Sequence, residues 1–149
     1  MPIGIISTLA PSAQAQFLRI IPNSTGGTFQ NNAQGVNATA LGSAASAQGD
    51  NAIAIGTNAS ASFGGNGAIA IGQNAVTAIG TPNATAVGAN SSAAGTDGTA
   101  IGEGTRANQE ATAVGSDAQS TGTSSTAVGN NSNAAADNSL AAGAGATVG

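Results

Sequence analysis

A unit of Ala, an aliphatic residue and Gly recurs eight times along this chain, at intervals close to fourteen residues. The intervals between successive glycines of this unit are 14, 16, 16, 14, 13, 14 and 14 residues. These glycines are Gly42, Gly56, Gly72, Gly88, Gly102, Gly115, Gly129 and Gly143. Self-similarity at so short a period indicates a solenoid, in which each repeat forms one coil and stacks on the next.

Composition limits what the interior of such a solenoid can contain. Aromatic residues make up 2% and charged residues 5% of the chain, and most of the 40% counted as hydrophobic is Ala. Close packing of a wide core needs bulky side chains, and Ala supplies little apolar area at roughly 25 cal/mol per Å². We therefore expect a thin core. The strict positions of the small residues and the net charge of only -4 argue against disorder.

The chain divides into three predicted segments. Residues 1–15 are apolar at the start and end on Ala-Gln-Ala, which fits either an atypical signal peptide without a basic region or an N-terminal lid. Residues 16–36 predict a capping strand and a first turn, because the open end of a solenoid needs a cap. Residues 37–149 predict the repeats of a β-roll. The chain has no run of eighteen apolar residues, so we expect no transmembrane helix in it.

Alternation within each repeat predicts two strands per coil. With the Gly as position 0, positions −4 and −2 are small and positions −3 and −1 are larger, as in Ile53 and Ile55. This period of two indicates a strand. Positions +3 and +5 are small again, with polar residues at +2 and +4, which predicts a second strand. Asn, Asp or Gly at position −5 predicts a tight corner, and the extra residues of the two long repeats fall near it.

The predicted coil has three surfaces. Its inside is lined by Ala, Gly and Ser, the outer face of the second strand is polar, and that of the first strand is an apolar stripe. Stacked at about 4.8 Å per coil, the stripe would run for about 40 Å, and soluble monomers rarely expose an apolar patch of this extent. We therefore predict that copies of the chain bury it between them. The predicted interface residues are Leu41, Ile53, Ile55, Ile69, Ile71, Val87, Ile101, Val114 and Val128.

The repeat resembles a known family in two strings, NAIAIGTNA at residues 51–59 and GAIAIGQNA at residues 67–75. Both are similar to the Asn-Ser-Val-Ala-Ile-Gly-x-x-Ser repeat of YadA-like heads in the trimeric autotransporter adhesins of Gram-negative bacteria. The resemblance covers roughly residues 30–149. It implies an all-β, left-handed parallel β-roll of coils of about fourteen residues, assembled as a homotrimer with the aliphatic stripe as its interface.

The resemblance also implies a function and a location. A head of this family is exported, displayed on the bacterial cell surface, and attached to host matrix or other surfaces through multivalent contacts. Extracellular-matrix proteins such as collagen are partners at the level of the family. The sequence has no evident neck, heptad stalk or C-terminal barrel, so outer-membrane anchoring is expected only if an anchor lies beyond this chain. The ligand is unknown, and no ligand-binding residue is nominated.

The side chains that carry most catalysis and metal binding are missing. The chain has no His, Cys, Lys, Tyr or Trp, which removes most general bases, nucleophiles and metal ligands. The six carboxylates are spread over several repeats, mostly at predicted corners. We expect no enzyme, no cofactor and no bound metal. Without a basic patch, we also expect no nucleic-acid partner.

Two alternative functions stay open at this point. One is a structural fibre module without adhesive activity. The other is an ice-binding solenoid, because Thr-x-Val and Thr-x-Ile rows on a flat sheet could order water. Ile53, Ile69 and Leu140 interrupt the row of threonines, which argues against it. The threonines concerned are Thr39, Thr85, Thr99, Thr112 and Thr126.

Overall fold

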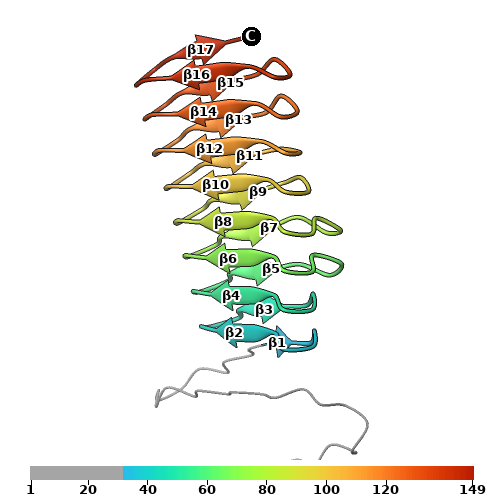
Figure 1. Ribbon diagram of the computed structural model, residues 1–149. Coiled ribbons are helices and arrows are strands. Elements are labelled where there is room, and N and C mark those ends of the chain that lie inside the picture. The colour runs from blue at the N-terminus through green and yellow to red at the C-terminus, as the bar shows by residue number, and fades with distance from the viewer. Residues whose placement is uncertain (1–31) are drawn as a thin grey trace, which may run out of the picture.

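The computed structural model describes residues 32–149, and the predictions for residues 1–15 and 16–31 lie outside this part of the chain. The described residues form two parallel sheets (Figure 1). The nine-stranded sheet contains β1 (Asn32–Ala33), β3 (Ser46–Ala47), β5 (Ser60–Ala61), β7 (Val76–Thr77), β9 (Ser92–Ala93), β11 (Arg106–Ala107), β13 (Gln119–Ser120), β15 (Asn133–Ala134) and β17 (Thr147–Val148). The eight-stranded sheet contains β2 (Thr39–Leu41), β4 (Ile53–Ile55), β6 (Ile69–Ile71), β8 (Thr85–Val87), β10 (Thr99–Ile101), β12 (Thr112–Val114), β14 (Thr126–Val128) and β16 (Leu140–Ala142).

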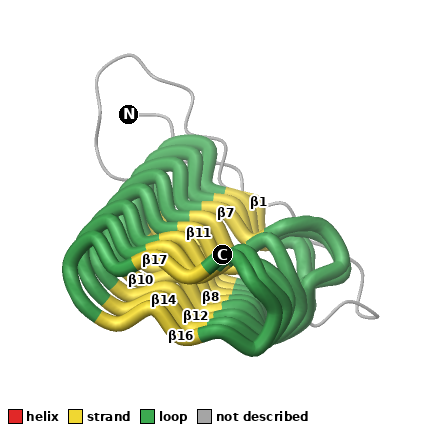
Figure 2. Tube along the Cα trace, turned by 90° about the horizontal axis from the view of Figure 1, so that it is seen from above, coloured by secondary structure: helices red, strands yellow, loops and turns green. Residues whose placement is uncertain are grey.

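Successive strands belong to alternate sheets, and the chain rises by one coil for every two strands (Figure 1). Seen from above, the sheets lie face to face with turns at both ends (Figure 2), and the winding is left-handed. Equivalent positions pair in every coil: Ala40 lies beside Ala54, and Ala54 beside Ala70. The predicted parallel β-roll, with two strands in each coil of about fourteen residues, is confirmed.

Small side chains fill the space between the sheets. The middle residue of each strand in the eight-stranded sheet is a buried Ala, and Ala54, for example, is 0% exposed. The second residue of β3 to β15 is also buried, most often as Ala. Thr77 and Ser120 replace Ala at this position: Thr77 Oγ1 accepts a bond from Ser62 N at 3.3 Å, and Ser120 Oγ bonds Ser125 Oγ at 2.6 Å. Ser91 and Thr105, buried just before β9 and β11, donate to carbonyl oxygens: Ser91 Oγ to Gly88 O at 2.9 Å and Thr105 Oγ1 to Gly102 O at 2.9 Å. The thin core therefore leaves these buried polar groups paired.

Position 0 lies at a corner and not inside the roll, so the prediction that its Gly lines the interior is wrong. We call this turn, residues 42–45 and their equivalents, the glycine corner. Gly72 has a φ of 134°, and a Cβ built on it would lie 2.4 Å from the carbonyl oxygen of Gly88 in the next coil. Gly is therefore needed for its conformation and for the close stacking of coils.

Position +2 belongs to the same corner and not to the second strand, contrary to the prediction. Asn58, Asn74 and Asn90 have φ angles of 56°, 56° and 57°, in the left-handed region that Asn tolerates. Their side chains form a ladder: Asn58 Nδ2 donates to Asn74 Oδ1 at 3.3 Å, and Asn74 Nδ2 to Asn90 Oδ1 at 3.1 Å. These bonds join coil to coil along the corner.

The opposite turn, which we call the loop corner, comprises residues 34–38 and their equivalents. It carries the predicted left-handed residues at position −5, with φ near 57° at Asn37, Asn83 and Asn138. A second ladder runs here, because Asn83 Nδ2 donates to Asp97 Oδ1 at 3.0 Å. The insertions of the two long coils extend this corner at residues 62–67 and 78–83, as the sequence predicts.

We expect Gly72→Ala to lower the free energy of unfolding by about 3 kcal/mol, because the methyl group adds backbone strain and a clash with the next coil. Denaturant unfolding followed by circular dichroism at a fixed protein concentration measures the loss. Gly143→Ala is the matched control. Gly143 also has a positive φ, of 119°, but nothing lies within 4 Å of its Cβ direction. An equal loss in the two variants would show that coil-to-coil packing does not require the glycine.

Candidate assembly interface

The two outward positions of each strand in the eight-stranded sheet form the apolar stripe. Register pairs align the third residues in one rank, from Leu41 beside Ile55 to Val114 beside Val128. The first residues form a second rank, in which Ile53 lies beside Ile69. The structure brings all nine predicted interface residues together on this one sheet face. Each lies next to a buried Ala of its own strand and therefore points away from the core.

Stacking covers part of each aliphatic side chain, but most of the stripe reaches the surface. Ile101 is 41% exposed and Val128 is 42% exposed, while the other seven predicted residues are half-buried. Ile fills both outward positions in β4 and in β6, so the stripe is widest there. Leu140 and Ala142 continue it into β16 and are exposed. No charged side chain lies on the outward positions of this sheet within residues 32–149.

Threonine occupies much of the rank next to the loop corner. Thr85, Thr99, Thr112 and Thr126 lie side by side in β8, β10, β12 and β14. Ile69 borders this row on one side, where it pairs with Thr85. From β8 to β14 the stripe is therefore one aliphatic rank edged by hydroxyl groups, and its bulkiest part lies in β4 and β6.

The outward face of the nine-stranded sheet is mostly polar, as the alternation predicts, and the exposed Val76 in β7 is its apolar exception. Its strands begin with Ser46, Ser60 and Ser92, which are half-buried, and with Arg106 and Gln119, which are exposed. The two flat faces of the roll therefore differ in chemistry. A polar face of this kind is hydrated in water, whereas the aliphatic face gains free energy when it is covered.

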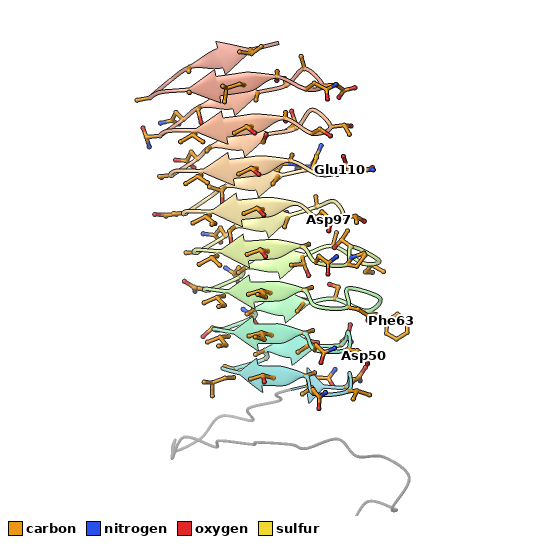
Figure 3. All side chains as sticks on the ribbon, viewed as in Figure 1. Asp50, Phe63, Asp97 and Glu110 are labelled. Atoms are coloured by element: carbon orange, nitrogen blue, oxygen red, sulfur yellow. The ribbon has the colours of Figure 1, made fainter. Side chains whose placement is uncertain are left out.

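Charged side chains lie away from the stripe. Asp50, Asp97 and Glu110 lie along one edge of the roll (Figure 3), at the loop corner. Neighbouring polar groups bond them: Ser124 Oγ donates to Glu110 Oε2 at 2.8 Å. Within residues 32–149, no group of three or more His, Cys, Asp or Glu side chains is arranged to hold a metal ion. The arrangement of side chains in this part of the chain is suited to assembly.

Comparison with known proteins identifies the repeat. The family model of the YadA head domain repeat matches residues 33–59, 82–105, 107–132 and 120–146, which together exceed half of the chain. No curated protein matches the sequence. Within the described residues, no helix is long and apolar enough to cross a membrane. The matched segments coincide with coils of the roll, and the chain belongs to the YadA head domain repeat family.

Proposed function

We propose that this chain forms the head of a trimeric adhesin, in which three rolls bury their apolar stripes against one another. The observation that carries the proposal is the continuous aliphatic face of the eight-stranded sheet. It extends from Leu41 to Val128 without a charged residue, and it is larger than a soluble monomer ordinarily exposes. Membership of the YadA head domain repeat family supports the same assembly.

A comparison of the free energy gained by covering the stripe with the free-energy cost of association indicates that assembly depends on the length of the stripe. Covering the exposed half of one aliphatic side chain contributes roughly 1 kcal/mol. Association costs about 4–15 kcal/mol in lost translational and rotational freedom. One or two coils could not offset that cost, whereas nine aliphatic residues in each protomer can. Repeating a similar coil many times is therefore a simple way to build a stable interface from a small unit.

Adhesion follows from assembly by multivalency. In the proposed function the head is exported, displayed at the cell surface, and binds host matrix or other surfaces; collagen is the matrix protein to test first. Three identical chains present each weak contact three times, so avidity multiplies a modest affinity. The role is structural and adhesive rather than enzymatic, in keeping with the family.

Ile71→Asp and Ile101→Asp should each abolish assembly, because an unpaired carboxylate in an apolar interface leaves a buried charge without a partner. Light scattering coupled to size exclusion measures the mass of each variant. Asn90→Asp is the control, since Asn90 is exposed at the glycine corner and an aspartate there still accepts the bond from Asn74. If all three variants keep the mass of the parent protein, the stripe is not the interface.

The row from Thr85 to Thr126 keeps an ice-binding solenoid as a second candidate function, because four threonines in register form a regular hydroxyl row. We expect the protein to be a trimer without thermal hysteresis activity. Solution mass and nanolitre osmometry on the same sample test both properties. A monomer that shows thermal hysteresis would overturn the trimeric head and favour ice binding.

Binding to immobilised collagen should depend on assembly. We expect the trimer to be retained on a collagen-coated biosensor at least ten-fold longer than the monomer produced by Ile71→Asp, because simultaneous contacts slow dissociation. Dissociation rates measured at two collagen densities separate avidity from single-site affinity. Equal dissociation rates for trimer and monomer at high collagen density would contradict a multivalent matrix contact.

A further inference from the structure

The two long coils project an apolar pair from the edge of the roll. Their loops, residues 62–67 and 78–83, reach beyond the corners of the neighbouring coils (Figure 1). Phe63 is 68% exposed and Ile79 is 79% exposed, the two largest exposed fractions among the bulky apolar side chains of the described residues. They occupy the same position, nine residues before the Gly of their coils. We call Phe63, Ile79 and their two loops the knob.

Hydrogen bonds hold the two loops of the knob against each other. Gly80 N donates to Phe63 O at 2.9 Å, and Asn83 N donates to Asn66 O at 3.0 Å. Within one loop, Thr81 Oγ1 donates to Ala78 O at 2.6 Å. These bonds fix the backbone of the two loops, so that Phe63 and Ile79 lie one above the other in successive coils. A surface that is already ordered loses little conformational entropy when a partner binds to it.

An exposed carboxylate borders the knob on each side. Asp50 lies in the coil before the knob. Its backbone carbonyl oxygen accepts a bond from Gly67 N at 2.8 Å, and its N–H donates to Asn66 Oδ1 at 3.2 Å. Asp97, in the coil after it, donates its N–H to Pro82 O at 3.1 Å. Figure 3 shows Asp50, Phe63 and Asp97 along one edge. Four successive coils therefore carry, in order, Asp50, Phe63, Ile79 and Asp97. At about 4.8 Å per coil, the two carboxylates are about 14 Å apart along the roll.

The knob is separate from the surface that the proposed trimer buries. The stripe covers a flat face of the eight-stranded sheet, whereas the knob projects from an edge of the roll (Figure 2). Residues 60–81, which include Phe63 and Ile79, also lie between the segments that match the family repeat. The role proposed below for the knob is therefore argued mainly from residues of this chain outside the matched repeats.

We propose that the knob docks a protein segment that carries an apolar side chain between two Lys or Arg residues, as on one face of a basic amphipathic helix. Phe63 and Ile79 supply the desolvated centre of the contact, and Asp50 and Asp97 select positive charge on either side of it. A helix rises 1.5 Å per residue, so about nine or ten residues span the two carboxylates. Arg106 is the only cation in residues 32–149, and it lies in β11 on the outward face of the nine-stranded sheet.

The test uses a fluorescein-labelled helical peptide built of Leu and Lys, with the leucines on one face. Fluorescence anisotropy measures its Kd for the intact protein. We expect the double change Phe63→Ser with Ile79→Ser to weaken binding at least ten-fold. Asp50→Asn with Asp97→Asn should weaken it about five-fold and reduce its salt dependence. The fold tolerates these changes because both apolar side chains are exposed and an Asn still accepts the bonds to Asp50 Oδ1 and Asp97 Oδ1.

Matched controls distinguish the knob from general attraction to an acidic protein. Val36→Ser removes an exposed apolar residue (56%) from the same edge, outside the knob. Glu103→Gln with Asp117→Asn removes two charges at the glycine corner. Both controls should bind the peptide as the parent protein does, and a twin peptide with Glu in place of Lys should not bind. Controls that weaken binding as much as the knob variants, or a Glu peptide that binds equally well, would overturn the proposal.

The same measurements separate this inference from the proposed trimer. The knob variants should keep the mass of the parent protein, while Ile71→Asp should lower the mass and keep the peptide affinity of each chain. If the parent protein is a monomer and binds the peptide through Phe63 and Ile79, the proposed trimer is contradicted and the proposed docking at the knob is supported. If the protein is a trimer and the knob variants bind the peptide as tightly as the parent protein does, the docking proposal is contradicted and the trimer is supported.

Discussion

The close stacking of similar coils in register is the constraint on which the rest of this structure depends. Each coil meets the next through parallel backbone pairing, with equivalent residues side by side along the whole roll. The two sheets approach closely because Ala lines the space between them. At the glycine corner the coils approach so closely that Gly72 has no room for a Cβ. A larger side chain at these positions would separate the coils or the sheets.

Register also turns single residues into continuous surfaces. One aliphatic residue per coil is an ordinary exposed side chain, but a rank from Leu41 to Val128 is an apolar face. The same geometry turns Asn58, Asn74 and Asn90 into a hydrogen-bonded ladder. It also places Phe63 and Ile79 one above the other at the edge, through the backbone bond between their loops. Proposed assembly and proposed docking therefore depend on one structural rule applied to two different positions of the coil.

Much of the fold and of the candidate interface could be predicted, because period-two alternation assigns each residue to a face without knowledge of distant contacts. Ile53 and Ile55 lie on the outward face, and Ala54 between them is buried, as predicted. The alternation failed at the glycine corner. Gly56 and Asn58 continue the alternating pattern in sequence, yet both adopt positive φ and end the strand. Alternation does not detect a left-handed turn when the turn residues keep the same phase.

The sequence by itself determined the coil length, the two-strand coil, the Ala core and the apolar stripe, because each is a local pattern repeated eight times. Tertiary structure alone decided why position 0 must be Gly, since the carbonyl oxygen that excludes a Cβ from Gly72 belongs to the next coil. It also decided that two insertions form one knob flanked by Asp50 and Asp97. These features depend on contacts between residues about fourteen to sixteen positions apart, and such contacts exist only once one coil has stacked on another.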